Sequence, residues 1–238
     1  MEHEHIVKSY DEELSHLQNM IAEMGGLAEM QLARAVNALA KFDAEAATAL
    51  VDKDRRIDQL EQEIDELSVR LIARRQPMAE DLRTIITGLR VSSNLERIGD
   101  YAKNIAKRTV TIASAPGLRG PIATIARMGA LVQSMIKSVL DAYIAHDADL
   151  ADDVRARDQE VDQIHSGLFR ELLTYMMEDP RNITPCTHLL FIAKNVERIG
   201  DHVTSVAEQV HYMVHGEMPL DERQKKDVSS FTQVEPTR

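Results

Sequence analysis

The chain has 238 residues, 44% hydrophobic and 28% charged, which is enough for one large domain or two small ones with a buried core. Its 28 Lys and Arg against 39 Asp and Glu give a formal net charge of −11. This balance disfavours nucleic acid as a partner, because a phosphate backbone requires clustered positive charge.

The longest apolar run is about five residues, far below the roughly 18 that span a bilayer. The first residues have neither a basic region nor an apolar signal segment. A single cysteine, Cys186, excludes an internal disulfide and a thiolate metal site. We therefore expect a soluble, cytoplasmic protein.

Aromatic residues make up 4% of the chain, and Gly and Pro number 10 and 7. Strand-rich folds need more turn residues than this, whereas the abundant Ala, Leu, Met, Glu and Arg favour helices. The composition predicts an all-α fold.

Breakers and capping residues predict where the helices begin. Ser9 and Glu12 have capping-box spacing, Asp43 and Asp147 each precede an Ala-rich first turn, and three prolines suit first turns, namely Pro77, Pro121 and Pro185. Gly25 and Gly26 predict a bend in the first helix, since each costs about 1 kcal/mol relative to Ala. The predicted helices are 9–42, 43–75, 78–113, 121–146, 147–178 and 185–215.

The chain contains an internal repeat. Residues 94–106 match residues 195–207 at an offset of 101, with seven of thirteen positions identical, and residues 43–58 align with 147–162 at an offset of 104. We interpret the protein as two tandem three-helix bundles with a polar tail. The boundaries are 1–114 for the first copy, 115–120 for a linker, 121–216 for the second copy and 217–238 for the tail, which we expect to be disordered.

Each copy carries two pairs of acids four residues apart, which places both carboxylates of a pair on one helix face. Glu96 and Asp100 lie away from the apolar stripe of their helix, so we expect them to be accessible. All-oxygen clusters suit hard cations and high-valent iron or manganese. The candidate metal ligands are Asp54, Asp58, Glu96, Asp100, Asp158, Asp162, Glu197 and Asp201.

Two simpler interpretations of these acids remain open. They are also what an ordinary solvated helix face presents, and Arg97 and Arg198 are placed to neutralise Asp100 and Asp201 in surface salt bridges. Against the first interpretation, like charges four residues apart are unfavourable, yet the arrangement recurs on two helices of each copy.

An enzymatic alternative rests on two other motifs. Glu13 with His16, and Glu208 with His211, have the spacing of ferritin-like di-iron bundles, but they are not related by the repeat. His188, His202 and Cys186 carry no catalytic signature, and phosphate-binding loops and nucleophile elbows are absent from the sequence. We do not expect an enzyme.

The doubled Asn-x-Glu-Arg-Ile-Gly-Asp signature, at Asn94 to Asp100 and Asn195 to Asp201, resembles the PhoU family of phosphate-transport accessory regulators. The run from Arg74 to Pro77 and the ending from His211 to Gly216 support the resemblance, which covers about residues 9–216.

The resemblance implies a cytoplasmic, homodimeric negative regulator of phosphate uptake and of phosphate-starvation signalling. Its partners would be the ATPase subunit of the phosphate ABC transporter and the sensor histidine kinase, and it would reach the membrane only through them. In some family members the acidic motifs bind metal, which implies iron, manganese or zinc at the eight acids named above. Tyr101 and Asn104 become His202 and Ser205 in the second copy, which leaves open whether both sites hold metal equally. An accessory role for a low-affinity phosphate transporter is a further alternative.

Overall fold

The computed structural model describes residues 2–52, 55–114 and 118–220. Within these ranges all regular structure is helical, which confirms the predicted all-α class. The elements are α1 (Glu2–Lys41), α2 (Ala44–Asp52), α3 (Arg55–Arg75), α4 (Ala79–Ile112), α5 (Arg119–Ala145), α6 (Ala148–Glu178), a short 3-10 helix η1 (Pro180–Asn182) and α7 (Ile183–His215).

Several predicted helix ends are wrong by a few residues. The first helix begins at Glu2, so Ser9 is not its cap; no Gly or Pro precedes Ser9 to stop the helix from extending. Helix α4 begins at Ala79, beyond Pro77. The predicted helix 43–75 corresponds to α2 and α3, on either side of residues 53–54, which lie outside the described residues.

The structure describes part of the predicted linker, 115–120, and part of the predicted tail, 217–238. Helix α5 begins at Arg119, within the segment predicted as a linker, and residues 115–117 of that segment lie outside the described ranges. Residues 217–220 follow α7 without helix. The rest of the predicted tail, 221–238, is also outside the described residues.

Each copy makes the same turn between its first two helices. Phe42 and His146, which are repeat equivalents, both adopt φ of 54°. The next residue then caps the following helix: Asp43 accepts a hydrogen bond from the Ala46 N–H at 2.9 Å, and Asp147 accepts one from the Leu150 N–H at 3.0 Å. The two predicted caps are confirmed, and the repeat extends to backbone geometry.

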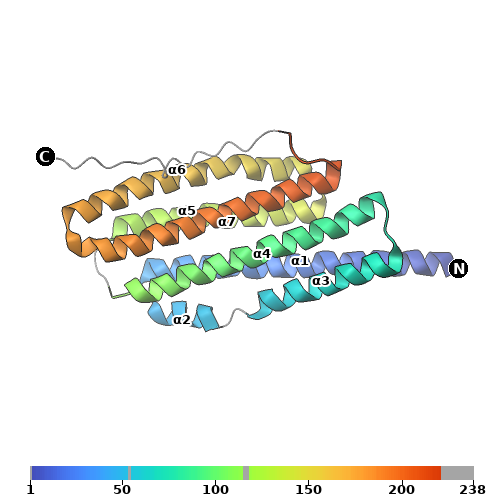
Figure 1. Ribbon diagram of the computed structural model, residues 1–238, viewed down its shortest axis with the longest axis horizontal. Coiled ribbons are helices and arrows are strands. Elements are labelled where there is room, and N and C mark those ends of the chain that lie inside the picture. The colour runs from blue at the N-terminus through green and yellow to red at the C-terminus, as the bar shows by residue number, and fades with distance from the viewer. Residues whose placement is uncertain (1, 53–54, 115–117, 221–238) are drawn as a thin grey trace.

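The long helices run roughly along one axis, with the two copies side by side (Figure 1). Helix α1 packs against α2, α3 and α4, and α5 packs against α6 and α7, while α4 packs on α7 and α1 on α5 between the copies. One continuous hydrophobic core runs through both copies. The two three-helix units are therefore halves of one bundle.

Gly25 and Gly26 do not interrupt α1, which is a single helix from Glu2 to Lys41. Gly26 faces open space, whereas a Cβ on Gly25 would clash with both terminal methyl carbons of Leu140 on α5. The absence of a side chain at Gly25 thus lets α5 approach α1 closely.

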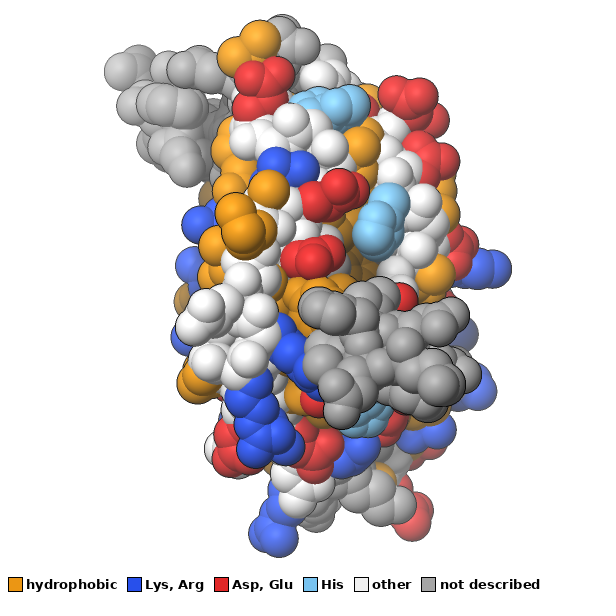
Figure 2. Space-filling view, turned by 90° about the vertical axis from the view of Figure 1, so that its right-hand side faces the viewer, with side chains coloured by type: hydrophobic (Ala, Val, Ile, Leu, Met, Phe, Trp, Pro, Cys, Tyr) orange, Lys and Arg blue, Asp and Glu red, His pale blue; other side chains and the backbone are white. Residues whose placement is uncertain are grey.

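No helix within the described ranges is long and apolar enough to cross a membrane. At the end of the bundle that faces right in Figure 1, acidic, basic and hydrophobic side chains are interspersed (Figure 2).

Candidate functional site

The first acidic cluster lies on α3 and α4. Asp58 is exposed on α3, and Glu96 and Asp100 are half-buried on α4. Sequence reasoning missed Glu61, whose carboxyl is influenced by the charges of Asp58 and Asp100. The fold therefore brings Asp58 of one predicted acid pair toward Asp100 of the other. Asp54, the second member of the first pair, lies outside the described residues.

Burial and neighbouring acidic charges disfavour the ionisation of Glu96 and Glu61. Burial, followed by the charge of Asp100, raises the pKa of Glu96 to about 7. Burial, followed by the charges of Asp65 and Asp58, raises the pKa of Glu61. Arg97, with its side chain 59% exposed, offsets little of this from 3.6 Å away from Glu96. Within this cluster Glu96 is thus partly protonated near neutral pH.

The second acidic cluster, on α6 and α7, is buried. Asp158, Asp162 and Glu197 are only 2%, 1% and 3% exposed, and Asp201 is half-buried. The accessibility that we expected of Glu96 does not extend to Glu197, its equivalent in the second copy, because α7 packs closely over this face of α6. A Cβ on the signature glycine Gly200 would lie 3.2 Å from Asp158 Oδ1, so only glycine admits the carboxylate at this distance.

Two residues missed by sequence reasoning belong to this second cluster. Lys194 Nζ donates a hydrogen bond to Glu197 Oε1 at 2.8 Å, which offsets part of the cost of burying that carboxylate. His165, 3% exposed, follows Asp162 by one helical turn. At an offset of 104 it stands where the first copy has Glu61, a signal that the repeat already contained.

The buried cluster borders a mostly apolar cavity of about 350 Å³ between α6 and α7, lined by His165 and Lys194 among others. In the described part of the chain, no three His, Cys, Asp or Glu side chains converge as they would around a bound metal ion. A metal at either cluster would therefore require the acids to change rotamer.

The two signature segments meet where α4 packs against α7. His202 Nδ1 lies 2.8 Å from Asn94 Oδ1, and the His202 ring lies 5.6 Å from that of Tyr101, its repeat equivalent. The Arg198 guanidinium lies over the Tyr101 ring at 5.7 Å. The motif thus joins the two copies as well as carrying acids.

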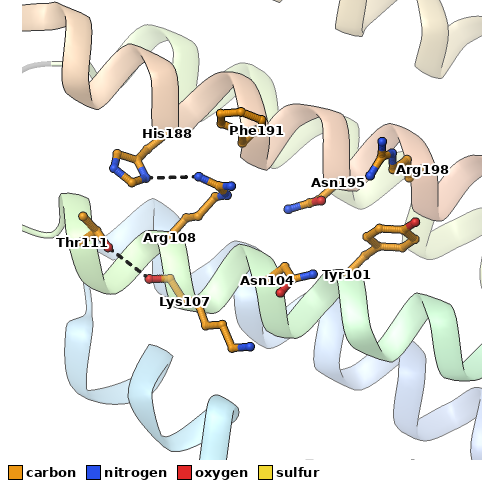
Figure 3. A pocket seen from close by; sticks show the side chains of 9 residues that line it. All are labelled: Tyr101, Asn104, Lys107, Arg108, Thr111, His188, Phe191, Asn195 and Arg198. Atoms are coloured by element: carbon orange, nitrogen blue, oxygen red, sulfur yellow. Dashed lines mark hydrogen bonds between the residues drawn. The ribbon is translucent and has the colours of Figure 1, made fainter.

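Beside these contacts, an open groove with a volume of about 520 Å³ lies between α4 and α7 (Figure 3). We call it the α4–α7 groove. Its lining residues are Tyr101, Asn104, Lys107, Arg108, Thr111, His188, Phe191, Asn195 and Arg198.

The geometry does not assemble the di-iron motifs. Glu13 forms an ion pair with Arg75 at 3.0 Å, and His211 Nδ1 lies 3.2 Å from Asp152. Helices α1 and α7, which carry the two motifs, do not contact each other over their described residues. Cys186 is buried, and burial raises the pKa of its thiol, which disfavours the nucleophilic thiolate.

The fold and these sites define a class of protein: a duplicated helical bundle whose copies each carry an acidic cluster and meet through a repeated signature. The PhoU domain model matches residues 21–109 and 125–210. The chain belongs to the PhoU family.

Relatives of the chain match over nearly their full length. A protein from Rhizobium meliloti is 48% identical over 97% of both chains, and one from Caulobacter vibrioides is 51% identical over 95% of this chain and 99% of its own. Both are described as "Phosphate-specific transport system accessory protein PhoU homolog".

Two solved structures share the fold. PhoU from Pseudomonas aeruginosa superposes with a TM-score of 0.84 at 40% identity, covering 87% of this chain and 100% of its own. The phosphate transport system regulatory protein PhoU from Streptococcus pneumoniae gives 0.82 at 30% identity, covering 88% and 99%.

Proposed function

We propose that the protein is an accessory regulator of phosphate-specific transport rather than an enzyme. The observation that carries this proposal is the near-complete match, through both copies, to relatives described as accessory proteins of that system. The buried thiol, the ion-paired Glu13 and the lack of contact between the described residues of α1 and α7 give no support to a di-iron oxidoreductase or storage bundle.

In more detail, we propose a negative regulator that acts in the cytoplasm as an adaptor. It would bind the ATPase subunit of the phosphate ABC transporter and the sensor histidine kinase, so that starvation genes stay repressed when phosphate is abundant. Such an adaptor must bind two conformational states of a partner with different affinities. Equal affinities would leave the equilibrium between those two states unchanged.

The test combines gene deletion with a reporter of phosphate-starvation transcription. In high phosphate we expect low reporter activity in wild type and high activity in the deletion strain, and we expect a second deletion, of the kinase, to restore the low level. An unchanged reporter in the first deletion would overturn the regulatory proposal.

Affinity capture from membranes addresses the partners. We expect the tagged protein to retain the ATPase subunit and the kinase, in amounts that differ between high and low phosphate. Capture of a low-affinity phosphate transporter in place of both would favour the alternative accessory role and contradict the adaptor.

We also propose that the protein is a homodimer and that its acidic clusters bind iron, manganese or zinc. The donors suit these ions, since the first cluster offers carboxylates and the second adds the imidazole of His165. Because the described side chains do not converge on one point, binding would require them to rotate.

A further inference from the structure

The α4–α7 groove is cationic, although the protein as a whole carries a net charge of −11. Lys107, Arg108 and Arg198 line it, and none of its nine lining residues is acidic. Elsewhere arginines are commonly held by carboxylates, as Arg56 is by Glu23 at 2.9 Å. No ion pair joins Lys107, Arg108 or Arg198 to a carboxylate among the residues that the structure describes.

Arg108 is held in the groove by an aromatic ring and an imidazole rather than by a carboxylate. Its guanidinium lies over the ring of Phe191 at 4.1 Å, and its Nη1 lies 3.5 Å from His188 Nδ1. Stacking on an aromatic ring fixes the plane of a guanidinium while leaving N–H donors for a ligand. Arg198 lies over the ring of Tyr101 at the longer distance of 5.7 Å.

The groove supplies neutral hydrogen-bonding groups between its charged ends. Asn104 and Asn195 lie between the Arg108 and Arg198 ends in Figure 3, and Asn195 is only 9% exposed. Tyr101 and Arg108 are seven residues apart on α4, which corresponds to about 10 Å along the helix. A single phosphate group is too small to contact both ends, whereas an anion with two or more phosphoryl groups is long enough.

The repeat supplies an internal comparison, because the opposite side of the α4–α7 interface is built from equivalent positions. There Glu208 stands in place of Lys107, and Gln209 in place of Arg108. Gln209 accepts a hydrogen bond from Arg90 Nη1 at 3.0 Å, and Arg90 lies over the ring of Tyr212 at 5.8 Å. The opposite side therefore has a carboxylate at the position of Lys107 and a neutral amide at the position of Arg108, so these two cations belong to one side only.

We infer that the α4–α7 groove is a binding site for a small polyphosphate anion, either inorganic or the phosphate chain of a nucleotide. Arg108 would hold one end of the phosphate chain and Arg198 the other, with charge-assisted hydrogen bonds. Asn104 and Asn195 would donate to the oxygens between them. The exposed Lys107 side chain points away from α7 in Figure 3 and would turn toward the groove to join Arg108. The inference goes beyond the proposed function and does not depend on it.

Calorimetric titration of the full chain with tripolyphosphate, ATP, orthophosphate and sulfate tests this inference. We expect tripolyphosphate or ATP to bind at least about tenfold more tightly than orthophosphate, because only the longer anions reach both ends. Tighter binding of ATP than of tripolyphosphate would identify a nucleotide site, and the reverse an inorganic one. Equal affinities for all four anions, or no binding of any, would overturn the inference.

The variant K107E/R108Q gives the groove the residues of the opposite side. We expect it to lower the affinity for the preferred anion by at least about tenfold while helicity and melting temperature stay close to wild type, since Lys107 is exposed and Arg108 half-buried. The control R127A/K137A also removes two cations, from exposed positions on α5, and should retain wild-type affinity. Equal loss in both variants, or none in the first, would place the anion elsewhere.

Discussion

Gly129 of α5 lies so close to Val36 of α1 that a Cβ on the glycine would be 2.8 Å from Val36 Cγ2. Gly25 and Leu140 are the repeat equivalents of these two residues, at an offset of 104, and they make the corresponding contact. The two contacts form a matched pair across the α1–α5 interface. At both positions the close packing of α1 against α5 favours glycine.

The substitution Gly129→Ala should destabilise the fold. Val36 is β-branched and buried, so it has little freedom to move from the added methyl. We expect overpacking to outweigh the gain in helix propensity and to lower the free energy of unfolding by about 1–2 kcal/mol. Urea unfolding measures this change.

Gly26→Ala is the matched control, because nothing lies within 4 Å of a Cβ at Gly26. There the helix propensity acts alone, and the free energy of unfolding should rise by about 0.5–1 kcal/mol. If both alanine variants were more stable than wild type, the close contact between Gly129 and Val36 would be contradicted.

Glu96 should make the stability of the protein depend on pH. Its folded pKa of about 7 lies above the ordinary value of 4.5, so the fold favours the neutral carboxyl. This contribution is fully present below pH 4.5 and is lost as pH rises through about 7. Relative to wild type, Glu96→Gln should therefore be more stable at pH 8, by about 1–3 kcal/mol, and equal at pH 4.5.

Chemical unfolding of both proteins with a chelator present, across this pH range, tests the prediction. The exposed Arg97 loses only a surface ion pair in the variant, which costs under about 1 kcal/mol. Parallel stability curves for wild type and variant would show that Glu96 ionises as an ordinary surface acid.

The arrangement of helices followed from the sequence because it rests on local signals. Asp43 and Asp147 cap their helices through hydrogen bonds to residues three positions later, which do not depend on tertiary packing. The two signature segments can likewise be aligned from the sequence alone. The burial of Asp158, Asp162 and Glu197 depends instead on how closely α7 approaches α6. A helical wheel describes one helix and not its neighbours, so it did not distinguish the exposed Asp58 from its buried equivalent Asp162.

Other parts of the site were within reach of the sequence. Asp158, Asp162 and His165 follow the spacing of one helix face, and His165 aligns with Glu61. Extending the acid pairs by one turn in both copies would have found both residues. The α4–α7 groove was not predictable in this way, because Arg108 and Phe191 meet only once the two copies pack.

A dimer should form through α1 and α5. Their outer faces border a cavity of about 230 Å³ lined mainly by small residues, including Ala40 and Ala130, and such a face admits a symmetry-related copy at close range. Light scattering at tens of micromolar should give twice the chain mass. The variant A40R/A130R should give the single mass, whereas A156R, on the exposed face of α6, should remain a dimer. A monomer in wild type would contradict the proposal.

The metal proposal makes different predictions for the two acidic clusters. E96Q/D100N removes carboxylates from the half-buried first cluster, so its helicity should be unchanged and its stability at neutral pH equal or greater, since like charges are removed. E197Q/D201N breaks the 2.8 Å ion pair of Glu197 with Lys194 and changes a buried group, so it should lose about 1–3 kcal/mol of stability.

Elemental analysis of untagged protein then decides whether the acids are ligands. If both clusters bind iron, manganese or zinc, each double variant should lose the metal of its own cluster and keep that of the other, because hard cations require the anionic oxygens that have been removed. The stability measurement separates a lost ligand from a lost fold, since E96Q/D100N should lose metal without losing stability. Equal metal content in wild type and in a variant with all four substitutions would show that these acids do not bind it.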